Sequence, residues 1–120
     1  MPTPFNKSLP IKESTIQRQI INLLKFYTDL VPVLFRINAG AIQTKQDRYI
    51  KLAPKGVSDI VGMLKDGTFL AIEVKTPKRR NRVTPEQADF IDNVNNNGGL
   101  GFVCTDPEEA LETIKERFKE

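Results

Sequence analysis

Two charged side chains interrupt an otherwise apolar segment, Phe69 to Lys75, which reads Phe-Leu-Ala-Ile-Glu-Val-Lys. Glu73 and Lys75 are two residues apart, so on a β-strand their side chains project from the same face. Burying a carboxylate and an ammonium group is costly unless something compensates their charge. A solvated polar face on an edge strand is the simpler explanation, and a functional site requires a further partner.

Asp59 becomes that partner if the segment before Phe69 folds back as a hairpin. The sequence Lys65-Asp66-Gly67 fits a three-residue loop with Gly67 in the left-handed conformation. This loop places Asp59 directly opposite Glu73, with Cβ atoms about 4.5 to 5.5 Å apart on one face. A loop of two or four residues would shift the register by one and send Asp59 to the other face.

Two adjacent carboxylates repel each other, and a divalent cation is the simplest relief in a partly buried site. The chain has no histidine and one cysteine, Cys104, which excludes imidazole and multi-thiolate metal sites and histidine-based nucleophilic catalysis. The remaining ligands are oxygen atoms, which predicts Mg²⁺ or Mn²⁺. Such an ion activates a water molecule, and Lys75 beside it would orient and help deprotonate that water or neutralise charge on a phosphate.

Three helices are expected around these residues. Apolar residues at three- and four-residue spacing predict a helix from about Ser14 to Tyr27, with Ser14 and Gln17 as a capping box. Thr84-Pro85-Glu86-Gln87 is typical of a helix start, and this helix should end near Asn97. Asp106-Pro107 opens an acidic C-terminal helix.

The extended segments complete an α/β pattern. Strands are predicted at Val33–Ile37, Arg48–Leu52 (the weakest), Asp59–Leu64, Phe69–Lys75 and Leu100–Cys104. Phe102 and Val103 beside Cys104 indicate that this cysteine is a small core residue. The order of helix, three or four strands, helix, strand and helix predicts an α/β sandwich.

Three motifs in the same order resemble the VRR-NUC branch of the PD-(D/E)XK nucleases. They are Lys55-Gly56-Val57-Ser58-Asp59-Ile60, Ala71-Ile72-Glu73-Val74-Lys75-Thr76-Pro77-Lys78 and Thr84-Pro85-Glu86-Gln87. The resemblance extends from about Glu13 to Gly99. It implies a restriction-endonuclease-like core, a central mixed β-sheet flanked by helices in the order αβββαβ plus a C-terminal helix, and metal-dependent phosphodiester hydrolysis.

By this resemblance, Asp59 and Glu73 are metal ligands and the backbone carbonyl of Val74 is a further ligand. Lys75 is the catalytic lysine, and Gln87 matches the family's glutamine on the following helix, which faces the same site.

Glu13 matches an acidic residue that many family members carry on their first helix, which makes it a further candidate metal ligand. Alternatively, it is a helix-start carboxylate favoured by the macrodipole, or it lies outside the helix if Ser14 is the cap. Ser58 stands where the superfamily has a proline, a position that contributes no ligand.

The segment from Lys75 to Arg82 holds five cations and no acid in eight residues, in a chain of net charge +3. Its cations Lys78, Arg79, Arg80 and Arg82 are candidates for binding nucleic-acid phosphates. The alternative is a solvated loop. Relatives often place a glycine after Thr-Pro-Lys, and this chain lacks it, so the path of the loop is not predicted.

Together these features predict a Mg²⁺-dependent DNA endonuclease, with Mn²⁺ able to substitute. Its substrate is expected to be branched DNA such as four-way junctions, and symmetric cutting of two strands would need a homodimer. The alternatives are a non-catalytic nucleic-acid-binding module on the same fold and a structural protein with an incidental Glu-x-Lys. A protein that only binds nucleic acid has no need for carboxylates that face a polyanion, which disfavours the binding module.

The composition fits one domain over residues 1–120, with a flexible N-terminus at 1–10. The chain shows no apolar run of membrane-spanning length and no targeting segment at its start, so we expect it in the cytoplasm and off the membrane. It also lacks the Gly-rich loop with which nucleotide-binding enzymes cradle phosphates.

Overall fold

The computed structural model describes residues 11–37, 41–43, 45–46, 49–51 and 53–119. Its centre is a four-stranded mixed sheet in the order β1-β4-β5-β6. These strands are β1 (Val33–Arg36), β4 (Ile60–Met63), β5 (Phe69–Val74) and β6 (Leu100–Cys104). β1, β4 and β5 are antiparallel neighbours, and β6 pairs with β5 in parallel. The predicted mixed sheet flanked by helices is confirmed.

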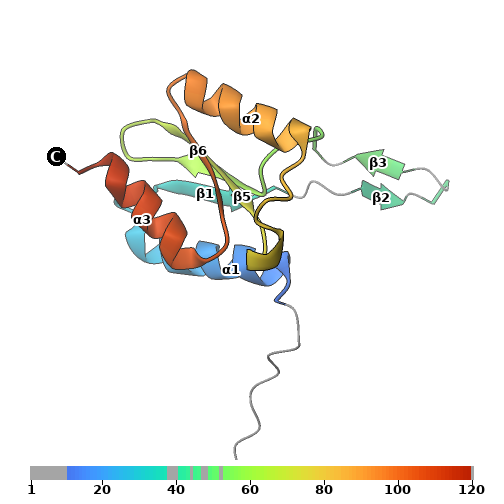
Figure 1. The fold of residues 1–120 in the computed structure, drawn as a ribbon, viewed down its shortest axis with the longest axis horizontal. Helices are drawn as coiled ribbons and strands as arrows, with labels where there is room; N and C mark the ends of the chain where they lie inside the picture. Colours follow the sequence, from blue (N-terminus) through green and yellow to red (C-terminus); the bar gives the residue numbers. More distant parts are fainter. Residues whose placement is uncertain (1–10, 38–40, 44, 47–48, 52, 120) are drawn as a thin grey trace, which may run out of the picture.

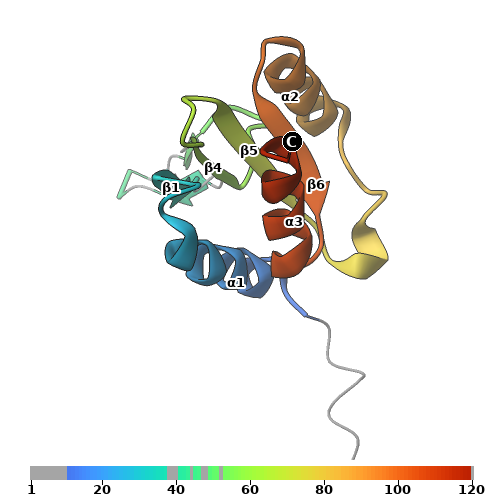
Figure 2. The same ribbon diagram turned by 90° about the vertical axis from the view of Figure 1, so that its left-hand side faces the viewer.

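Three helices cover the two faces of this sheet: α1 (Glu13–Leu24), α2 (Pro85–Asn96) and α3 (Pro107–Arg117). Figures 1 and 2 show α1 and α3 on one face and α2 on the other. None of the described helices is long and apolar enough to cross a membrane. The predicted flexible N-terminus, 1–10, lies outside the described residues.

The hydrophobic core lies between the sheet and the pair α1 and α3. Apolar side chains from every second position of β4, β5 and β6 enter it, because side chains alternate between the two faces of a strand. Its fully buried members include Ile20, Ile60, Leu64, Leu70, Ile72, Val74, Cys104 and Ile114. Cys104 is thus the small core residue that its neighbours predicted, and burial raises the pKa of its thiol to about 12.

The opposite face packs against α2 through two small residues of the β6 region. A Cβ atom on Gly101 would lie 3.4 Å from Ile91 of α2, and one on Gly99 would lie 2.6 Å from Val94. The absence of side chains at these positions lets α2 approach the backbone closely. α2 therefore covers the β6 side of this face.

The predicted hairpin between β4 and β5 is confirmed, including its register. Gly67 has φ +86°, and its N–H donates to the Leu64 carbonyl. Ile60 lies opposite Ile72, and Met63 lies opposite Phe69. The strands themselves are slightly shorter than predicted, because Asp59, Leu64 and Lys75 fall outside them.

The start of α1 differs from the prediction. The helix begins at Glu13 with Lys12 as its N-cap, and no side chain caps it. Ser14 lies inside the first turn, so the predicted capping box with Gln17 is wrong. A carboxylate is favoured near the positive end of the helix dipole, which suits Glu13 to the first turn. The regular helix ends at Leu24, and a 3₁₀ turn, η1 (Lys25–Tyr27), completes the predicted length.

The weak strand predicted at Arg48–Leu52 corresponds to β3 (Tyr49–Lys51), whereas Arg48 and Leu52 themselves lie outside the described residues. β3 pairs with an unpredicted strand, β2 (Ala41–Gln43), in a separate two-stranded sheet. This hairpin extends away from the main sheet beyond the end of β1 (Figure 1).

Candidate active site

Asp59 and Glu73 face each other at the end of the β4–β5 hairpin. The observed register continues directly from Ile60 opposite Ile72 to Asp59 opposite Glu73. The N–H of Leu64 donates to the Thr68 carbonyl, 2.9 Å away, which makes this a hydrogen-bonded pair. Because such pairs alternate, Asp59 and Glu73 occupy a non-hydrogen-bonded position, where Cα atoms are about 4.5 Å apart and side chains are closest. The predicted convergence of the two acids is confirmed.

The Asp59 side chain also ends the ladder between the two strands. Its Oδ2 accepts a hydrogen bond from the backbone N–H of Val74 at 2.8 Å. The alternation of pairs would otherwise direct this N–H to the backbone of residue 58. The carboxylate therefore replaces a strand carbonyl, which fixes its own position beside Glu73.

Glu73 is almost completely buried, with 2% of its surface exposed. Its Oε1 has no hydrogen-bond partner among the described residues. Burial raises the pKa of Glu73 to about 8, with further upward contributions from the charge and hydrogen bonding of Asp59. Two ionised carboxylates are therefore unfavourable here, and a proton or a cation bound between them stabilises the pair.

Lys75 supplies part of that positive charge. It is 8% exposed, and its Nζ lies 3.8 Å from Oε2 of Glu73. Its charge lowers the pKa of Glu73, but burial and Asp59 outweigh it. The prediction that Glu73 and Lys75 share one face of the strand is confirmed by this ion pair.

Glu13 lies in the first turn of α1 and contributes a further negative charge to the site. It is half-buried, and its carboxylate is the last of the five influences on the pKa of Glu73, which it raises. The alternative that Glu13 lies outside the helix is wrong. The helix-start role is consistent with this placement. The ligand role stays a prediction, because Glu13 does not join Asp59 and Glu73 in a three-acid group that could hold an ion.

The donors at this site suit a hard divalent cation. Two carboxylates, one of which has a buried oxygen without a partner among the described residues, are the ligand type that Mg²⁺ and Mn²⁺ prefer. Within the described part of the chain, no group of three or more acids or cysteines could hold an ion. Mg²⁺ usually keeps several waters and takes one or two protein carboxylates, so Asp59 and Glu73 fit its needs.

Gln87 occupies the N3 position of α2, where its side chain takes part in the predicted helix cap. Its Oε1 accepts from the backbone N–H of Thr84 at 3.0 Å, and its own N–H donates to Thr84 Oγ1 at 3.1 Å. The helix start predicted from the Thr84-Pro85-Glu86-Gln87 motif is thus confirmed, and the capping box is a feature that the structure adds. The predicted role of Gln87 at the acidic site stays a prediction.

Gly56, a residue to which sequence reasoning assigned no role, positions the segment that leads into Asp59. It has φ +90°, and a Cβ atom there would lie 2.6 Å from the carbonyl oxygen of Glu86. Only glycine fits this conformation and this close approach to the start of α2. The signal was present as the glycine of the motif before Asp59.

The basic segment after Lys75 forms a 3₁₀ turn, η2 (Pro77–Arg79), and then an exposed loop. The side chains of Lys78, Arg79 and Arg82 are exposed to solvent. This exposure fits both the nucleic-acid role and the solvated-loop alternative, so the nucleic-acid role stays a prediction.

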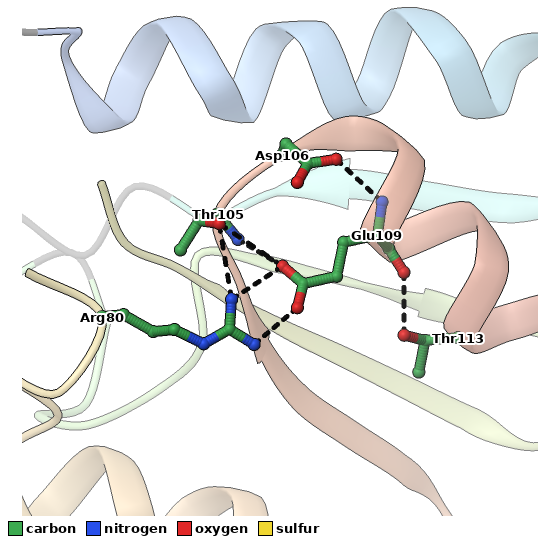
Figure 3. A network of polar contacts seen from close by, with 5 residues as sticks. All are labelled: Arg80, Thr105, Asp106, Glu109 and Thr113. Atoms are coloured by element: carbon green, nitrogen blue, oxygen red, sulfur yellow. Dashed lines mark hydrogen bonds and ion pairs between the residues drawn. The ribbon is translucent and has the colours of Figure 1, made fainter. Parts of the chain in front are cut away.

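Arg80 differs from its basic neighbours because its guanidinium is engaged within the protein. Figure 3 shows its two-pronged ion pair with Glu109 of α3, with distances of 3.0 Å from Nη1 to Oε1 and 2.5 Å from Nη2 to Oε2. Glu109 Oε1 also accepts from the backbone N–H of Thr105 at 2.8 Å. Sequence reasoning missed Glu109, which reads as one acid in the first turn of an acidic helix.

Comparison with known protein families agrees with this geometry. The model of the VRR-NUC domain family matches residues 6–106, which is most of the chain. No curated protein and no solved structure matches the chain significantly. The chain therefore belongs to the VRR-NUC family, whose domain is a nuclease domain of the PD-(D/E)XK-like superfamily.

Proposed function

We propose that this nuclease-type domain is a divalent-metal-dependent DNA endonuclease whose active site is built from Asp59, Glu73 and Lys75. The observation that carries the proposal is the close opposition of Asp59 and Glu73, with a buried oxygen on Glu73 that has no partner among the described residues. Two carboxylates in this position repel each other when both are ionised, and a bound cation relieves that repulsion. Membership of a nuclease family supports a role for such a cation site in phosphodiester hydrolysis.

In this proposal, Asp59, Glu73 and the Val74 carbonyl hold Mg²⁺ or Mn²⁺, and Glu13 is a further acidic ligand. The bound ion would supply positive charge that activates water and stabilises the scissile phosphate. Lys75 orients the attacking water and neutralises charge that develops on the phosphate. Gln87 would act through its side-chain nitrogen, because its oxygen accepts the bond from Thr84.

The loop after Lys75 is proposed to bind the DNA backbone. Lys78, Arg79 and Arg82 are exposed cations a few residues beyond the acidic site, so phosphates bound by them would lie near it. Arg80 is the fourth candidate of the sequence. Its ion pair with Glu109 supports a different contribution, that of holding the loop in place.

Branched DNA, with four-way junctions as the leading example, is the proposed substrate. Phosphate contacts read the course of the backbone rather than base sequence, which favours recognition of DNA shape. Symmetric cutting of two strands needs two active sites, and each chain carries one set of residues. We therefore propose a homodimer as the working form.

A cleavage assay with matched variants tests this function. Labelled four-way junction, flap and plain duplex DNA would be incubated with Mg²⁺, Mn²⁺ or EDTA. We expect the wild-type protein to cut with either metal, to be inactive in EDTA, and to prefer the junction. Asp59→Asn and Lys75→Met should each lower the cleavage rate by at least about 100-fold.

The controls are Asp92→Asn on the exposed side of α2 and Lys25→Met in η1, which should cut at the wild-type rate. DNA binding without cleavage in any metal would favour the non-catalytic binding module. Full activity of Asp59→Asn or Lys75→Met would remove these residues from the active site.

A further inference from the structure

Strand β1 forms an open edge of the main sheet. It is the first strand in the order β1-β4-β5-β6 and pairs only with β4 among the described strands. The N–H of Ile37 donates to the Asp59 carbonyl at 2.8 Å, so this is a hydrogen-bonded pair. By alternation, Val33 and Phe35 also bond to β4, whereas the N–H and C=O groups of Leu34 and Arg36 point away from the sheet.

These outward groups lie beside an apolar surface. Val33 is 40% exposed and Phe35 is 50% exposed, and Met63 and Phe69 continue the same face across β4 and β5. Soluble proteins usually protect a free edge with lysine, proline or a bulge. Within β1 only Arg36 is charged, and it projects from the opposite face to Phe35. The edge is therefore suited to pair with another strand.

We propose that β1 pairs with β1 of a second copy of this chain, antiparallel about a two-fold axis at Phe35. In this register Phe35 lies opposite Phe35 of the other copy, and Leu34 lies opposite Arg36. All outward N–H and C=O groups of these two residues then find partners. The two sheets join into one continuous eight-stranded sheet.

Backbone hydrogen bonding and side-chain pairing both favour this register for two copies of β1. A two-fold axis at Leu34 instead would set Arg36 opposite Pro32, which has no N–H to donate. In the register centred on Phe35, no arginine faces an arginine, so like charges are not opposed. The two phenylalanine rings meet at a non-hydrogen-bonded position, where aromatic pairs are favourable.

This arrangement deepens the proposed function, on which its biological meaning rests, because it relates the two active sites. A two-fold axis perpendicular to the sheet leaves both Asp59–Glu73 pairs on the same face. The centres of the two pairs are separated by four strand spacings across the sheet and four residues along it, which is about 24 Å. One DNA-facing surface would thus carry both sites.

Cysteine cross-linking tests the register directly. Phe35→Cys would be oxidised without DNA or metal, and disulfide-linked dimer would be measured over time on non-reducing gels. Opposed Cα atoms at such a position, about 4.5 Å apart, lie within the range of a disulfide. The control is Phe26→Cys, because Phe26 is 83% exposed but lies in η1. The native Cys104 is fully buried and stays unreactive.

We expect Phe35→Cys to cross-link at least about tenfold faster than Phe26→Cys, because pairing raises its effective concentration. Equal rates would overturn the proposed interface. The wild type should sediment as a dimer and Phe35→Lys as a folded monomer with the secondary structure of the wild type by circular dichroism. A monomeric wild type, or a Phe35→Lys variant that stays dimeric, would also overturn it.

These measurements separate the interface from the chemistry. If Phe35→Cys fails to cross-link while the wild type still cuts DNA, the proposed interface is wrong and the active site stands. If the dimer forms but no metal supports cleavage, the interface stands without the nuclease. With both correct, Phe35→Lys should still nick single strands but lose paired cuts in a junction.

Discussion

The Asp59 carboxylate accepts a hydrogen bond from the Val74 backbone N–H, one residue beyond the glutamate that it faces. One oxygen of Asp59 is thereby fixed by the strand, and the side chain is held close to Glu73. The position of the Asp59 carboxylate beside Glu73 is therefore set by backbone geometry.

The Val74 hydrogen bond predicts different stabilities for two substitutions at Asp59. Asp59→Ala leaves the Val74 N–H without its acceptor, which costs about 1 to 3 kcal/mol, partly offset by lost repulsion with Glu73. Asp59→Asn keeps an oxygen acceptor and should be more stable than Asp59→Ala by about 1 kcal/mol. Urea unfolding in EDTA measures both. Equal stabilities would show that the hydrogen bond contributes nothing.

Glu73→Gln should separate stability from metal binding. The buried carboxylate lies beside Asp59, and an amide of similar shape removes their repulsion. In EDTA at pH 8 we expect the variant to melt at the same or a higher temperature than the wild type. Mg²⁺ should raise the melting temperature of the wild type but not of the variant. A lower melting temperature in EDTA would contradict this account of Glu73.

The ion pair of Arg80 and Glu109 predicts a pH-dependent contribution to stability. Hydrogen bonding to Arg80 is the main cause that lowers the pKa of the Glu109 carboxylate from 4.5. The pair therefore stabilises the fold above about pH 4.5 and loses this effect as the pH falls through the lower folded pKa.

Arg80→Met should reduce the free energy of unfolding by about 0.5 to 1 kcal/mol at pH 7, because the pair is partly exposed. The difference from wild type should shrink in acid. The charge-reversed double variant Arg80→Glu with Glu109→Arg should recover part of the loss. Urea unfolding at pH 7 and pH 3 checks these points, and a difference that grows in acid would be inconsistent with the ion pair.

Arg79 and Arg80 form a matched pair for DNA binding. Arg79 is an exposed cation, and the guanidinium of Arg80 is bound to Glu109. Arg79→Ala should reduce the slope of log affinity against log salt by about one, as expected for one lost phosphate contact. Arg80→Ala should change the slope by less. Titrations of a labelled junction at several salt concentrations measure both slopes, and an unchanged slope for Arg79→Ala supports the solvated-loop alternative.

The hairpin register was predictable because a short turn determines it. Gly67 in the left-handed conformation closes a three-residue loop, and side-chain alternation then brings Asp59 to Glu73. The start of α2 was predictable for the same local reason, since Thr84 and Gln87 cap each other three residues apart. Turns and helix caps of this kind depend only on a few neighbouring residues, so the sequence predicts them.

Features that depend on distant segments were not predictable. The partner of Arg80 is 29 residues away in sequence, and nothing local distinguishes Glu109 from the other acids of α3. The start of α1 was ambiguous because Ser14 favours a cap and Glu13 favours the first turn. β2 lacked a recognisable pattern because a three-residue strand offers too few positions to show alternation.

Anomalous diffraction from crystals soaked in Mn²⁺ tests the central claim most directly, because it locates the ion relative to the two acids. The account predicts one strong peak bonded to carboxylate oxygens of both Asp59 and Glu73, lost in Glu73→Gln crystals. A well-diffracting crystal with Mn²⁺ bound only elsewhere, and the two carboxylates turned apart, would contradict it.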